Sequence, residues 1–137
     1  MSKNYFWIGL IGIVIVSLAV LVGFLPDTTK TATLPLEVSV NEAYQMREEG
    51  AYILDVREVN EWEEAHIPGA TLLPLGELES RLGEIPKDQD VVIVCRSGNR
   101  SAQARDLLMS AGFTNITSMA GGMNQWIANS FEFESGK

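Results

Sequence analysis

The chain has 137 residues, enough for one domain, and its hydrophobic fraction of 46% is too high for a disordered protein. Its formal net charge of −8 argues against nucleic acid as a partner, because proteins that bind nucleic acid normally present a basic stripe to the phosphates. One cysteine excludes an intramolecular disulfide, and one cysteine with one histidine cannot complete a zinc site. We therefore expect no metal site, and we expect no cofactor.

The N-terminal part of the chain is strongly apolar. After a short tail, residues 1–5, the residues from 6 to 25 carry no charge. Such a run would extend roughly 30 Å as a helix, the thickness of the hydrocarbon core of a bilayer. Tyr5 and Trp7 lie at one end, where amphipathic rings favour the membrane interface. The pattern predicts a transmembrane anchor, with a cleaved signal sequence as the alternative.

The orientation of the anchor follows from the positive charges around it. Lys3 and the terminal amine favour a short N-terminal tail on the inside. Residues 26–35 are rich in threonine and read as a tether. We therefore expect a single-pass membrane protein whose catalytic domain is extracytoplasmic. If the apolar run is instead cleaved, the domain would be secreted or periplasmic.

Residues 36–129 alternate between helical and extended patterns, and residues 130–137 read as a C-terminal tail. Ser39 with Glu42 predicts a capping box that opens a helix through about Glu49. Val91–Cys95 is the clearest strand, because four successive apolar residues fit burial on both faces. The other expected strands cover 51–56, 70–73 and part of 113–119, and the other expected helices cover 59–64, 75–82, 101–111 and 122–129. Alternating elements of this kind indicate a parallel sheet covered by helices.

The loop after the strand Val91–Cys95 carries the strongest chemical signal in the sequence. Ligands of open α/β sheets bind beyond the carboxyl ends of the strands. Gly98 allows the loop to curl so that its N–H groups form a nest for an anion, and a helix begins near Ser101. Arg96 and Arg100 add two permanent cations. Together these features predict a lowered pKa for Cys95. The alternative is a buried structural cysteine.

Four segments of the chain resemble those of the rhodanese-type sulfurtransferases. The first is the loop Cys95–Arg100 itself. The others are Asp55-Val56-Arg57, His66-Ile67-Pro68-Gly69-Ala70, and Gly121-Gly122 with Trp126. They occur in the family's order and cover about residues 36–128. One departure is Ala65, where many members carry glycine before the histidine.

This resemblance implies a fold, a three-layer α/β sandwich around a five-stranded, mostly parallel sheet. It also implies a reaction in which the Cys95 thiolate takes a sulfane sulfur from thiosulfate or a persulfide. The resulting Cys95 persulfide passes that sulfur to an acceptor such as cyanide or a thiol. A protein partner is not predicted. The residues expected to bind substrate are Arg96, Ser97, Gly98, Asn99, Arg100 and Arg57, and those expected to support them are Asp55, Ser101 and His66.

Some of these side chains have a purely structural alternative. Arg57 attracts the anionic donor in one interpretation and forms a structural ion pair with Asp55 in the other. His66 is interpreted chiefly as a hydrogen-bonded residue of a turn, and Trp126 as part of the core. The acidic residues after Arg57 are expected to form a solvated helix face; they are Glu58, Glu61, Glu63 and Glu64.

Two other functions remain as alternatives. A related phosphatase or arsenate reductase would use a cysteine, five residues and an arginine, whereas four residues separate Cys95 from Arg100. The shorter loop makes a smaller cradle, which suits a sulfur atom better than a phosphate. The second alternative is a non-catalytic docking module. Such modules commonly lose the cysteine or the loop glycine, and this chain retains both Cys95 and Gly98.

Overall fold

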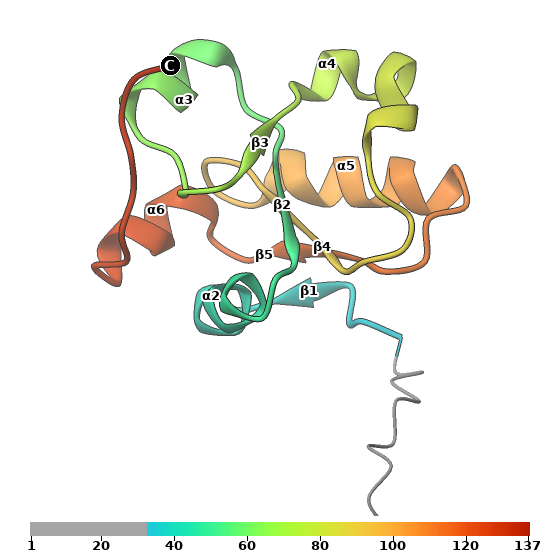
Figure 1. Cartoon of the computed structure of the whole chain (residues 1–137), viewed down its shortest axis with the longest axis horizontal. Helices are drawn as coiled ribbons and strands as arrows, with labels where there is room; N and C mark the ends of the chain where they lie inside the picture. The colour runs from blue at the N-terminus through green and yellow to red at the C-terminus, as the bar shows by residue number, and fades with distance from the viewer. Residues whose placement is uncertain (1–32) are drawn as a thin grey trace, which may run out of the picture. The chain divides into compact units, whose positions relative to one another are not determined.

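The computed structural model describes residues 33–137, which form one compact unit (Figure 1). Within this range no helix is long and apolar enough to cross a membrane. The predicted tail 1–5, the predicted anchor 6–25 and most of the predicted tether lie outside the described residues.

A five-stranded sheet forms the centre of the unit, in the order β1-β5-β4-β2-β3. Every pair of neighbouring strands in it is parallel, so the sheet is wholly rather than mostly parallel. Central β4 pairs with β2 through Asp55↔Val94 and with β5 through Ile93↔Ser118. The strands are β1 (Glu37–Val38), β2 (Tyr52–Asp55), β3 (Thr71–Leu72), β4 (Val91–Val94) and β5 (Ile116–Met119).

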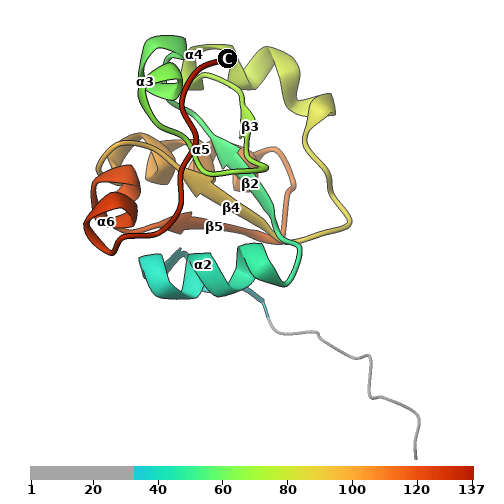
Figure 2. The same cartoon turned by 60° about the vertical axis from the view of Figure 1, so that its left-hand side comes forward.

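Helices cover both faces of the sheet, as the predicted sandwich requires (Figures 1 and 2). Alternate residues of β4 explain this arrangement, because Val91 and Ile93 face one apolar cluster while Val92 and Val94 face the other. The first cluster includes residues of α4 (Leu75–Leu78) and α5 (Asn99–Ser110), and the second includes residues of α2 (Val40–Glu48) and α6 (Gly122–Ala128). The remaining helices are α3 (Val59–Glu64) and the 3₁₀ helix η1 (Glu79–Glu84).

The observed elements differ from the predicted ones in three places. Strand β1 was not predicted, since two residues are too few to show a periodic pattern. The helix expected over 75–82 is divided into α4 and η1, and η1 itself is interrupted at Arg81, which leaves the helical conformation at φ −123°. Helix α5 begins at Asn99 rather than Ser101, because Gly98 before it turns the chain with φ +108°. Elsewhere the expected strands and helices match the observed ones within a few residues.

The segment after α6, which the sequence suggested to be a tail, lies along the domain. Glu134 exchanges two backbone hydrogen bonds with His66, each 2.8 Å long. The Trp126 indole donates to the Glu132 carbonyl at 2.8 Å, and Phe131 stacks on Tyr44 with 4.3 Å between ring centroids. Residues 131–134 therefore contribute to the folded unit.

Candidate active site

The candidate active site lies at the carboxyl edge of the sheet, in the loop 95–98 between β4 and α5. Since β4 is flanked by β2 and β5, the segments that follow these two strands lie on either side of the loop. The segment after β2 leads through Arg57 into α3, and the segment after β5 leads through Gly121 into α6. Three elements that are distant in sequence thus surround one cysteine.

Cys95 is buried, with 1% of its surface exposed, and its thiol faces the inside of the loop. The backbone N–H of Gly98 donates to Sγ at 3.0 Å. Sγ also lies 3.5 Å from Oγ of Ser101, whose hydroxyl donates to the Gly98 carbonyl at 2.9 Å. As a thiol, Cys95 donates to Ser101. As a thiolate, it can instead accept from the Ser101 hydroxyl, which needs only to rotate.

The pKa of Cys95 reflects a competition between burial and hydrogen bonding. Burial raises the pKa, because it penalises the charged thiolate. The Ser101 hydroxyl and the backbone N–H groups of Ser101, Gly98 and Ser97 lower it, and their combined effect outweighs burial. The pKa therefore falls below the ordinary value for a thiol. This is the direction expected for a nucleophilic cysteine.

Helix α6 fixes the opposite side of the loop. The N–H of Met123 donates to the Cys95 carbonyl at 2.8 Å, and the N–H of Asn124 donates to the Arg96 carbonyl at 3.0 Å. Gly122 permits this approach, because a Cβ at that position would collide with the Cys95 carbonyl oxygen. With the loop carbonyls held by α6, the N–H groups that follow are free to face the thiol. The Gly121-Gly122 pair thus belongs to the site, although it was not among the predicted site residues.

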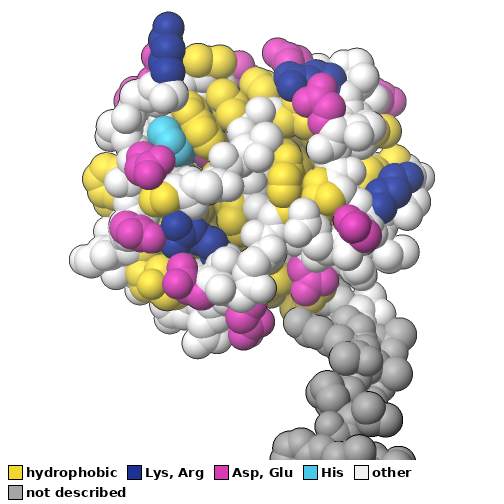
Figure 3. Space-filling view, in the orientation of Figure 1, with side chains coloured by type: hydrophobic (Ala, Val, Ile, Leu, Met, Phe, Trp, Pro, Cys, Tyr) yellow, Lys and Arg dark blue, Asp and Glu magenta, His cyan; other side chains and the backbone are white. Residues whose placement is uncertain are grey.

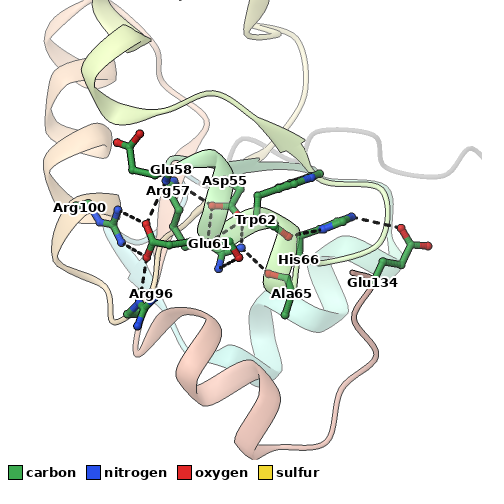
Figure 4. Close-up of polar contacts among 10 residues, drawn as sticks. All are labelled: Asp55, Arg57, Glu58, Glu61, Trp62, Ala65, His66, Arg96, Arg100 and Glu134. Carbon is green, nitrogen blue, oxygen red and sulfur yellow. Dashed lines mark hydrogen bonds and ion pairs between the residues drawn. The ribbon is translucent and has the colours of Figure 1, made fainter. Parts of the chain in front are cut away.

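Arg96 of the loop and Arg100 at the start of α5, here called the loop arginines, both bind the carboxylate of Glu61 (Figure 4). Glu61 accepts from both terminal nitrogens of Arg100, each at 2.7 Å, and from Nε of Arg96 at 3.0 Å. The Arg100 guanidinium, followed by the hydrogen bonds from Glu58 and Arg96, overcomes the effect of burial and lowers the pKa of Glu61 to about 2. Glu61 is therefore ionised throughout the neutral range.

This arrangement corrects one expectation and refines a second. We expected Glu61 to lie on a solvated face, but only 7% of it is exposed. We also expected the nest of N–H groups and the charges of Arg96 and Arg100 to stabilise the thiolate together. The hydrogen-bond donors have the largest lowering effects on the pKa of Cys95. The charge of Cys95 also helps to raise the pKa of Arg100, so these two groups interact as well. A signal for Glu61 was present in the sequence. Two arginines in one short loop need an anionic partner, and Glu61 follows Glu58 at the three-residue spacing of a capping box.

Asp55 and Arg57 form the structural ion pair that was one of the two interpretations. Both are buried, with 1% and 4% of their surface exposed. The Arg57 guanidinium donates to Asp55 at 2.6–3.1 Å, to the Glu61 carbonyl at 3.1 Å and to the Ala65 carbonyl at 2.8 Å. Arg57 therefore holds α3 on the end of β2 and does not face an incoming donor. Ala65 is extended at φ −164°, so the departure from glycine causes no strain there.

His66 contributes to packing around α3. Its ring stacks on Trp62 with 3.8 Å between centroids, and Nδ1 lies 2.9 Å from the Trp62 carbonyl. Nε2 faces Glu134 at 3.6 Å. Figure 4 shows His66 directed towards Glu134 and away from the two loop arginines. The interpretation as a hydrogen-bonded residue of a turn describes this environment.

The outer rim of the loop is accessible. Arg96, Ser97 and Asn99 are exposed, whereas Cys95 and Ser101 below them are buried. A reactant must therefore reach the thiol with a slender group. Within residues 33–137, no cluster of three or more His, Cys, Asp or Glu side chains is placed to hold a metal ion. The site offers a thiolate, backbone N–H donors and a cationic rim.

Comparison with protein families matches residues 39–129 to the rhodanese-like domain, and the chain belongs to this family. A protein named sulfurtransferase from Allochromatium vinosum is 42% identical over 78 residues, which cover 57% of this chain and 73% of that protein. YrkF of Bacillus subtilis is 40% identical over 93 residues, covering 66% of this chain but 50% of YrkF. The chain thus spans about half the length of that relative.

A solved structure of the human single-domain sulfurtransferase TSTD1 has the same fold. It superposes with a TM-score of 0.65 at 29% sequence identity, over 69% of this chain and 97% of the human chain. The fold expected from the four sequence segments is therefore confirmed.

Replacing Ser101 with alanine tests the hydrogen bonding of the thiol. The variant loses the hydroxyl that stabilises the thiolate, so the pKa of Cys95 rises and its alkylation by iodoacetamide at pH 7 slows about three- to tenfold. The pH dependence of the alkylation rate gives the pKa directly. Ser110→Ala, at the exposed far end of α5, is the matched control and should titrate like the parent. Identical titration of Ser101→Ala and the parent would show that the hydroxyl has no such role.

Proposed function

We propose that the protein is a sulfurtransferase that carries a sulfane sulfur on Cys95. The observation that carries the proposal is the buried Cys95 thiol, which receives the Gly98 N–H at 3.0 Å and lies beside the Ser101 hydroxyl. Family membership and the relatives named sulfurtransferase support the same reaction class. The donor is thiosulfate or a persulfide, and the acceptor is a thiol or cyanide.

The proposed reaction has two displacement steps. The Cys95 thiolate attacks the sulfane sulfur, a new S–S bond forms, and the donor leaves with the electrons of the broken bond. The outer sulfur of the persulfide carries the negative charge and stays within the N–H groups of the loop. A second nucleophile then attacks that outer sulfur, and Cys95 leaves as a thiolate. No general base is needed, because the pKa of Cys95 is already lowered.

The orientation of Arg100 argues against a phosphatase. In the alternative reaction, an arginine separated from the cysteine by five residues, at position 101 in this numbering, would close around a tetrahedral oxyanion. Here Arg100 comes one residue earlier and directs both terminal nitrogens to Glu61.

Acidic and basic side chains are interspersed on the face shown in Figure 3, which gives no support to a polyanionic partner such as nucleic acid.

Mass spectrometry of the purified protein tests this function. A sulfane donor should add one sulfur atom to Cys95, and cyanide should remove it as thiocyanate. Cys95→Ser should abolish both steps, because a serine hydroxyl neither ionises at neutral pH nor forms a persulfide. Thiosulfate, an alkanethiosulfonate and glutathione persulfide should each be tried. Hydrolysis of an aryl phosphate without sulfur uptake from any donor would favour the phosphatase, and neither reaction would favour the docking module.

We also propose that residues 6–25 anchor the protein in a membrane, with the domain on the extracytoplasmic side. The support is the uncharged run of residues with Tyr5 and Trp7 at one end. The full chain should then remain in the membrane fraction after a carbonate wash. A mature protein whose N-terminus begins within or after the apolar run would show that the segment is a cleaved signal.

A further inference from the structure

The loop arginines differ in how much of their hydrogen-bonding capacity is engaged. Arg100 directs both terminal nitrogens to Glu61, and 31% of its side chain is exposed. Arg96 is 56% exposed, and within the described chain its guanidinium is held by one hydrogen bond, from Nε to Glu61. The two terminal nitrogens of Arg96 are thus available at the rim of the site, on a guanidinium that is anchored at its base.

Glu61 also changes the charge that a donor meets. Two arginines contribute two positive charges, and the ionised carboxylate cancels one of them. The pKa of Glu61, lowered to about 2 chiefly by Arg100, makes this cancellation permanent near neutral pH. Glu58 adds a further acidic influence, because its charge helps to raise the pKa of Arg100, after the larger effects of Glu61 and of the Cys95 charge. With Cys95 ionised, the thiolate, Glu61 and the two arginines sum to zero.

We propose that Glu61 is a positioning residue that makes the site prefer monoanionic sulfane donors to dianionic ones. It binds both terminal nitrogens of Arg100 and anchors Arg96. It cancels one of their two positive charges and so leaves one in excess at the rim. This inference rests on the proposed sulfur transfer. The donor class is one with a single negative charge near its sulfane sulfur, such as an alkyl persulfide anion. Thiosulfate, with two charges, is disfavoured by the carboxylate behind the arginines.

Two donors differ by one charge and share the same chemistry. Thiosulfate is a dianion, and methanethiosulfonate is the corresponding monoanion with a methyl group in place of one oxygen. With either donor, Cys95 forms a bond to the terminal sulfur and the bond from that sulfur to the sulfonyl sulfur breaks. The electron pair leaves with sulfite or methanesulfinate, and the Cys95 persulfide keeps one negative charge. The ratio of the two rate constants therefore reports the charge of the site.

The test is the substitution Glu61→Gln, measured as the rate of persulfide formation on Cys95 under limiting donor. The ratio of kcat/KM for thiosulfate to that for methanethiosulfonate should rise about three- to tenfold, because the variant removes one negative charge from beside the arginines. A general loss of loop order lowers both rates and cancels in the ratio. Glu64→Gln on the exposed part of α3 changes the net charge of the protein equally and should leave the ratio unchanged.

A second variant tests the inference even if Glu61→Gln does not fold. Arg96→Gln removes an exposed cation from the rim and should lower the same ratio. The inference is overturned if Glu61→Gln leaves the ratio unchanged or lowers it, or if Arg96→Gln does not lower it. Absence of a Cys95 persulfide with every donor, in the parent protein, would instead contradict the proposed function.

Discussion

The carboxylate of Glu61 joins the two segments of the chain on which the site depends. It lies on α3, which follows β2, and it binds Arg96 and Arg100 from the loop and helix that follow β4. A buried carboxylate is costly to place without partners, and here three guanidinium hydrogen bonds and the Glu58 N–H satisfy it. The position of α3 and the shape of the loop are therefore set together.

Helix α3 is also held by a second buried ion pair, that of Asp55 and Arg57. Asp55 at the end of β2 holds Arg57, and Arg57 donates to the carbonyls of Glu61 and Ala65. On the other side of the loop, the first N–H groups of α6 hold the carbonyls of Cys95 and Arg96. These contacts make the loop rigid from both flanks. Because they engage the arginines and the carbonyls, the groups that face the thiol are neutral N–H and O–H donors.

Much of the fold is predictable from the sequence because its signals are local. The apolar run Val91–Val94 predicts a strand buried on both faces, and Gly98 predicts the curl before α5. Because ligands of such sheets bind beyond the carboxyl ends of the strands, the loop around Cys95 is then predicted to be the reactive site. What local patterns do not reveal is which side chains meet after folding. Glu61 has the composition of a surface helix residue, and its burial follows from the approach of Arg100, 39 residues later.

The roles of the three arginines illustrate the same limit. In the sequence Arg57, Arg96 and Arg100 are equivalent candidates for binding an anionic donor. In the structure, Arg57 is enclosed by its partners, Arg100 is engaged with Glu61, and Arg96 keeps its terminal nitrogens at the surface. Only the three-dimensional contacts distinguish a structural cation from one that is free to meet a reactant.

The central claim is that neutral hydrogen-bond donors contribute more than the two arginines to holding Cys95 in its ionised form. The most direct measurement is a pH titration of the Cys95 thiol in the parent protein and in Arg96→Gln, followed by the ultraviolet absorbance of the thiolate. Our account predicts titration curves with nearly the same midpoint, because Arg96 is exposed and binds Glu61 rather than Cys95, and the hydrogen bonds from Gly98 and Ser101 remain. A midpoint displaced clearly to higher pH in Arg96→Gln would contradict it.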